Sequence, residues 1–91
     1  GTKEEERAKI DKTAVDEQAA RSVLLSFLEA DSYSEKLDIV YSGKKHLNDR
    51  VINDMSVALD CTIEDGPLDE RIANLINCLQ ALRRFENRRL R

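Results

Sequence analysis

The sequence has few residues that interrupt helices or cross-link the chain. Its 91 residues include one proline, three glycines, two cysteines and no tryptophan. With so little turn chemistry, a fold of many short strands is disfavoured. Two tyrosines and two phenylalanines are the only aromatic residues, so we expect an aliphatic core. The length fits one domain with a single core.

Long apolar runs are also absent, and no run exceeds three residues, as in Val23-Leu24-Leu25. Such runs are far too short to cross a bilayer. The charged opening of the chain does not resemble a signal peptide. The sequence therefore predicts a cytoplasmic protein that does not bind membranes. Gly1 stands where an initiator methionine would be, which suggests a part of a longer protein.

Apolar residues recur at helical spacing along most of the chain, which predicts an all-α fold. We expect a small four-helix bundle with a long C-terminal amphipathic helix. Residues 1–12 are mostly charged and are expected to form a flexible N-terminal segment. Residues 13–91 are expected to form a single helical domain. Its four helices should cover about residues 14–30, 33–42, 49–60 and 67–90.

Local signals mark several helix ends. Ser32 and Glu35 have the spacing of a capping box, and Asn48 is placed to cap the next helix. Gly43 is expected to follow the second helix as a glycine beyond its C-cap. Pro67 suits the first position of the last helix, where its missing N–H costs nothing.

The first helix is predicted to be the central one. With Thr13 as its N-cap, it carries apolar residues on most of its sides. A helix of that kind is usually buried on most sides. We therefore expect Leu24 and Leu28 to be buried and the helix to touch at least two others.

Cys61 and Cys78 are predicted to be free thiols, because the chain has no secretory signal and disulfides are rare inside cells. Cys78 lies on the apolar stripe of the last helix. A zinc site is not expected, because only His46 is left to join the two cysteines and four ligands are needed. No cofactor is predicted.

The end of the chain is strongly basic. Residues 81–91 contain five arginines against Glu86, a net charge of +4, which leaves −7 for the rest because the total is −3. Cations at a helix C-terminus favour its dipole and keep it solvated. They also suit an acidic protein surface or nucleic acid. The candidate partner-binding residues are Arg83, Arg84, Phe85, Arg88, Arg89, Leu90 and Arg91.

A matching acidic face is predicted on the third helix through Asp49, Asp54 and Asp60, in the same chain or in a second copy. Nucleic acid is the less favoured partner, because Phe85 is the only aromatic residue among the arginines to stack on bases. No nucleotide-binding, catalytic or metal motif is present. No small-molecule ligand is evident from the sequence.

Together these features predict a non-enzymatic helical protein–protein interaction or assembly module. It is expected to act as part of a larger protein or to associate with itself. The alternative is a nucleic-acid-binding accessory protein that uses the C-terminal arginine cluster.

Overall fold

The computed structural model describes the backbone of residues 2–89 and the side chains of residues 15–88. Within that part the fold is all-α, as predicted. Its elements are α1 (Thr2–Glu29), α2 (Tyr33–Ser42), a 3-10 turn η1 (Lys44–His46), α3 (Asp49–Leu59) and α4 (Leu68–Arg89). None of the described helices is both long and apolar enough to cross a membrane.

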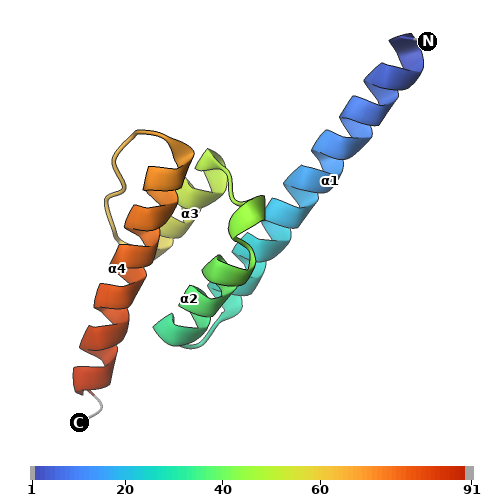
Figure 1. The fold of residues 1–91 in the computed structure, drawn as a ribbon. Helices are drawn as coiled ribbons and strands as arrows, with labels where there is room; N and C mark the ends of the chain where they lie inside the picture. Colours follow the sequence, from blue (N-terminus) through green and yellow to red (C-terminus); the bar gives the residue numbers. More distant parts are fainter. Residues whose placement is uncertain (1, 90–91) are drawn as a thin grey trace.

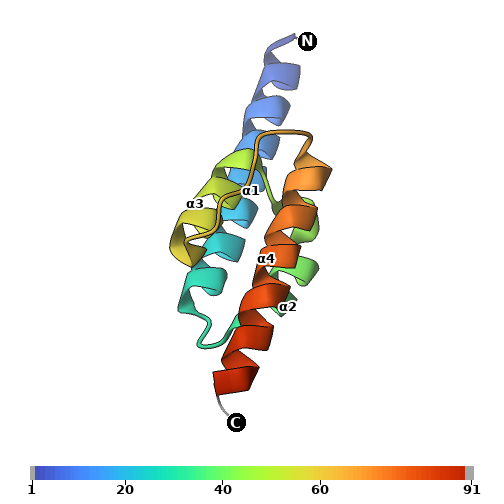
Figure 2. The same ribbon diagram turned by 90° about the vertical axis from the view of Figure 1, so that its left-hand side faces the viewer.

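The helices form a bundle in which neighbours run in different directions. Helices α1 and α2 are antiparallel and joined by a short turn, whereas α3 and α4 are parallel because the loop 60–67 carries the chain back (Figures 1 and 2). Helix α2 packs mainly on α4, and α1 packs on both α2 and α3. The first half of α1 extends beyond the other helices, which makes the molecule 63 Å long and 26 by 18 Å wide (Figure 1).

All four helices contribute to an aliphatic core that includes one aromatic side chain. The largest fully buried side chains are those of Phe27, Val40, Ile52, Met55, Leu75 and Leu79. Burial of such side chains stabilises a fold by roughly 1.5–3 kcal/mol each. The expectation of an aliphatic core is confirmed.

The predicted caps of α2 and α3 are confirmed. The Ser32 hydroxyl accepts a hydrogen bond from the Glu35 backbone N–H at 3.1 Å. The Asn48 side-chain oxygen accepts one from the Val51 N–H at 2.9 Å. Each cap satisfies a backbone donor that has no partner within its helix.

Gly43 ends α2 as predicted, but its role differs from that of a left-handed glycine. Its φ of −100° is open to any residue. A Cβ built there would lie 2.7 and 2.8 Å from the two methyl carbons of Val23. Gly43 is therefore needed for the close approach of this corner to α1. The left-handed conformation occurs instead at Asp60, which ends α3 with φ 54°.

The predicted start of the first helix is wrong. Helix α1 begins at Thr2 and runs through Thr13, so Thr13 cannot be an N-cap, which requires a non-helical backbone. The flexibility expected for residues 1–12 in solution stays a prediction, and residue 1 lies outside the described part of the chain.

The central position expected for the first helix is also wrong. Helix α1 touches two helices, as expected, and buries Ala20 and Phe27 on one side. Leu24 is half-buried, but Leu28 is 48% exposed and Leu25 faces solvent with it. Helices α2 and α3 cover one side of α1 only, so its apolar outer side remains in solvent.

The prediction of free thiols is wrong, because Cys61 and Cys78 form a disulfide with their Cα atoms 6.8 Å apart. The loop 60–67 returns the chain to the start of α4. Helix α4 then runs parallel to α3, so that Cys78, about three turns after the start of α4, comes level with Cys61. The disulfide therefore ties the end of α3 to the middle of α4.

Candidate interaction site

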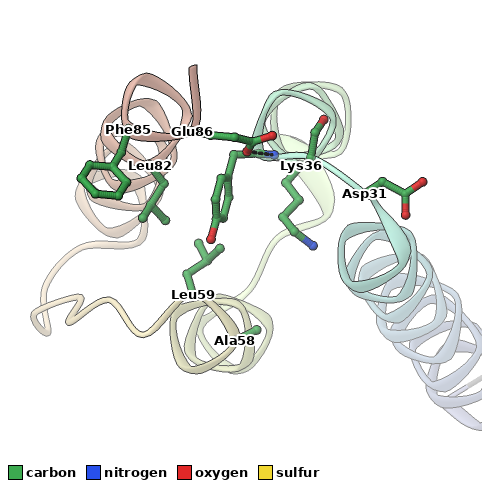
Figure 3. A pocket seen from close by; sticks show the side chains of 9 residues that line it. Asp31, Lys36, Ala58, Leu59, Leu82, Phe85 and Glu86 are labelled. Carbon is green, nitrogen blue, oxygen red and sulfur yellow. Dashed lines mark hydrogen bonds between the residues drawn. The ribbon is translucent and has the colours of Figure 1, made fainter. Parts of the chain in front are cut away.

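A hollow of about 760 Å³ opens at the end of the bundle that holds the α1–α2 turn and the last turns of α4 (Figure 3). We call it the basal hollow. Residues of α2, α3, α4 and the α1–α2 turn surround it. They are Asp31, Ser32, Tyr33, Lys36, Ala58, Leu59, Leu82, Phe85 and Glu86.

The basal hollow exists because α3 is much shorter than the parallel α4. Helix α3 has 11 residues and α4 has 22, so their lengths are about 16 and 33 Å. The two helices start together, and α3 ends at Leu59, beside Leu82 in the wall of the hollow. Phe85 lies one turn further along α4, where α3 no longer covers it. Its side chain is 63% exposed.

Two polar contacts hold the walls in place. The Glu86 carboxylate on α4 accepts a hydrogen bond from the backbone N–H of Tyr33 at 3.2 Å and so joins α4 to the first turn of α2. The Lys36 ammonium donates to the Phe27 carbonyl at 2.6 Å and lies 4.8 Å from the centre of the Phe27 ring. These contacts fix α2 against α4 and α1, so the hollow is formed without a partner.

The structure brings only part of the predicted partner-binding set to this hollow. Phe85 lines it, Arg83 is half-buried, and Arg84 and Arg88 are exposed on α4. The side chain of Arg89, and both Leu90 and Arg91, lie outside the described part of the structure. The hollow itself, with Tyr33 and Leu82, was not anticipated from the sequence.

The acidic face predicted on α3 is used differently from the expectation. Asp49 accepts a hydrogen bond at 2.5 Å from the guanidinium of Arg71, which is 4% exposed and also donates to Asn53. Among the described side chains this is the one ion pair. Arg71 lies 13 residues before Arg84, a distance of about 20 Å along α4. Asp49 of α3 is therefore not paired with the arginine end of its own chain.

Sequence reasoning missed Arg71 as well. Its signal was its place on α4, next to Ile72 and one turn before Leu75, on the apolar side of an amphipathic helix. A charged residue in that position is either unpaired, which is costly, or bonded to a neighbouring element. Here it connects the first turns of α3 and α4.

Two acidic residues line the basal hollow, Glu86 of α4 and Asp31 of the α1–α2 turn. We call Glu29, Asp31 and Glu35 the acidic turn; all three are exposed. Asp31 lines the hollow on the side opposite Phe85 (Figure 3). The Glu35 carboxylate accepts a hydrogen bond from the Asp31 N–H at 3.1 Å. The charged residues that line the hollow are thus Asp31, Lys36 and Glu86, and neither Arg84 nor Arg88 lines it.

No cluster of three or more His, Cys, Asp or Glu residues that could hold a metal ion occurs in the described part of the chain. His46 lies half-buried in η1, away from the basal hollow.

Comparison with models of protein families finds no match to this chain, and neither curated proteins nor solved structures match it.

Proposed function

We propose that this chain is a non-enzymatic helical protein–protein interaction or assembly module that binds its partner in the basal hollow. The supporting observation is Phe85, a large aromatic side chain left 63% exposed beside an apolar wall of Tyr33, Leu59 and Leu82. Exposed apolar surface of this kind, rimmed by charged groups, is typical of interaction sites. Aromatic anchors carry much of the binding energy at such sites.

The chemistry of the hollow favours a protein side chain over a small polar ligand. Small-molecule sites use a few converging polar groups to orient their ligand. In this hollow Glu86 and Lys36 already bond to backbone atoms of Tyr33 and Phe27. Apolar and polar groups line the hollow in similar measure. An apolar anchor from a partner needs only contact with the apolar part, which Tyr33, Leu82 and Phe85 supply.

Photo-crosslinking in cells tests the proposal. A benzophenone amino acid replaces Phe85 in one variant and Val57 in another. Val57 is an exposed apolar residue of α3 that does not line the hollow, so it is the matched control. We expect a discrete protein adduct from position 85 and none from position 57. Equal labelling from both positions, or no adduct from position 85, would contradict the proposal.

A second measurement tests the nucleic-acid alternative. We expect a mixed-sequence DNA or RNA oligonucleotide not to bind. Micromolar binding, with a salt dependence that falls when Arg84 and Arg88 become Ala, would replace the proposal, because each lost phosphate contact lowers the salt slope.

The cytoplasmic location stays a prediction. The disulfide weighs against it, because cytosolic proteins seldom keep structural disulfides. The redox state of Cys61 and Cys78 in cells, trapped by rapid alkylation, tests the location.

A further inference from the structure

The disulfide lies at the edge of the basal hollow and joins two of its walls. Cys61 comes two residues after Leu59, the last residue of α3, and Cys78 comes about one helical turn before Leu82 of α4. Leu59 and Leu82 both line the hollow, one on each of these walls (Figure 3). The bond therefore holds the α3 wall at a fixed distance from the α4 wall.

Few other contacts hold the end of α3 and the loop 60–67 in place. In this loop Cys61 and Ile63 are partly buried, and the other six residues are exposed. Val57, in the last turn of α3, is 79% exposed. The backbone N–H groups of Asp60 and Cys61 bond to carbonyls of α3 itself, so these bonds do not attach the loop to α4.

The rest of α3 is anchored independently of the disulfide. The Arg71 side chain of α4 donates hydrogen bonds to Asp49 and Asn53 of α3, and Ile52 and Met55 are fully buried in the core. Segments with few buried contacts open locally while the rest of a protein stays folded. Loss of the disulfide should therefore release the last turn of α3 and the loop, and leave the bundle intact.

We infer that the Cys61–Cys78 disulfide is a redox switch that controls the basal hollow. In the oxidised form the bond holds Leu59 in the wall and keeps the hollow in its binding shape. In the reduced form the end of α3 and the loop are released, and partner binding weakens. The inference rests on the proposed function, whose regulation it names.

The switching reaction is thiol–disulfide exchange with a dithiol or with two molecules of a monothiol such as glutathione. A thiolate of the reductant attacks one cysteine sulfur, the S–S bond breaks, and the other cysteine leaves as a thiolate that takes up a proton. A second reductant thiolate attacks the mixed disulfide and releases the first cysteine. Two electrons and two protons thus pass to the protein, and the reductant becomes a disulfide.

The positions of the two cysteines suit such a reaction. Both are partly exposed, so a reductant can approach the bond in the folded protein. Disulfides of cytosolic proteins are usually transient and redox-sensing rather than structural. A switch of this kind is therefore compatible with the predicted cytoplasmic location.

Access of the reductant is tested on the oxidised, folded chain. We expect an excess of reduced glutathione to open the bond without denaturant, seen by mass spectrometry as two alkylated thiols. A bond that stays closed until the chain is denatured overturns the switch.

Backbone order parameters from NMR relaxation test the release of the hollow wall. The oxidised chain is compared with the reduced chain and with the double variant Cys61→Ser and Cys78→Ser, which lacks the bond without a reductant present. We expect order parameters of residues 58–66 to fall from about 0.85 to below about 0.6 in both, with those of α2 unchanged. Unchanged values in residues 58–66, or an equal fall in α2, overturn the inference.

Crosslinking in cells from a benzophenone at position 85 tests the control of binding. Cells are treated before irradiation with diamide, which oxidises thiols, or with dithiothreitol, which reduces disulfides. We expect an adduct at least fivefold stronger after diamide than after dithiothreitol. The variant with both cysteines replaced by Ser should give the weaker level after either treatment, whereas the control Thr62→Ser, an exposed residue beside Cys61, should respond as the unchanged chain does.

The two proposals can fail separately. Equal adducts after both treatments would overturn the switch and retain the interaction module. Absence of any adduct after either treatment would contradict both.

Discussion

The buried Arg71 gives the sharpest test of how this fold is held together. Its side chain is only 5% exposed, while that of its partner Asp49 is 67% exposed. Its Nε is buried without a hydrogen-bond acceptor. A buried polar group without a partner costs about 1–3 kcal/mol, and burial of the charge itself adds a further penalty. An ion pair with one solvent-exposed partner adds only about 0–1 kcal/mol to the free energy of unfolding.

Two perturbations should therefore have opposite effects. Arg71→Met keeps most of the side-chain volume and removes both the buried charge and the unpaired Nε. We expect the free energy of unfolding to stay the same or to rise by up to about 2 kcal/mol. The double variant Asp49→Ala with Asn53→Ala leaves the guanidinium buried without acceptors. Breaking a buried pair costs about 3–5 kcal/mol, and solvent access at Asp49 should reduce the loss to about 2–3 kcal/mol.

Urea unfolding followed by circular dichroism measures both changes, with the disulfide kept intact. The exposed Asp54 on the same helix provides the matched control, since Asp54→Ala changes helix propensity without touching Arg71. A loss above about 2 kcal/mol for Arg71→Met, with no loss for the double variant, would refute the reasoning. It would show that Arg71 stabilises the junction of α3 and α4 through contacts other than its bonds to Asp49 and Asn53.

Two further predictions concern the loop 60–67 and the end of α2. Alkylation of denatured, non-reduced protein should label neither Cys61 nor Cys78, and reduction should lower the free energy of unfolding by about 3 kcal/mol, because the disulfide closes a loop across 17 residues. Labelling of both thiols would contradict the pairing. Gly43→Ala should cost about 1–3 kcal/mol in urea unfolding, because its Cβ would overlap Val23. The control Gly66→Ala, where a Cβ meets nothing closer than 3.5 Å, should change stability by less than about 0.5 kcal/mol; equal losses would show that crowding is not the cause.

The features that sequence reasoning found are those decided by neighbours in the chain. Ser32 and Asn48 cap helices by bonding a backbone N–H three residues later. Such bonds depend only on local geometry, so residue type and spacing predict them. The period of the apolar residues likewise gave the four-helix, all-α class, because one helix face must be buried wherever the helices pack.

The features that sequence reasoning missed join distant parts of the chain. The bond from Tyr33 to Glu86 spans 53 residues, and the disulfide depends on α3 and α4 being parallel. Nothing near Cys61 indicates that direction. The wrong prediction for Leu28 has the same cause. An apolar pattern shows which sides of a helix can be buried, but not how many neighbouring helices will cover them.

The candidate site was predicted in part for the same reason. Phe85 was selected because it stands among arginines, yet its role depends on where α3 stops. The cap at Asp60 ends α3 while α4 continues for several turns, and the basal hollow lies where α3 is missing. The length of one helix relative to another is set by its caps, but its position along the neighbour is set by the loop between them.

The position of Phe85 also separates the two explanations of the basic helix end. Arginines at a helix C-terminus favour its dipole and keep it in solution, whether or not a partner exists. That explanation gives no reason for a phenylalanine that is 63% exposed. A single exposed apolar residue is common on protein surfaces. Phe85, however, shares a preformed hollow with Tyr33 and Leu82, and α4 is fixed beside it through Glu86. The dipole explanation concerns only the arginines, whereas the proposed docking surface would also use the hollow and the fixed position of α4.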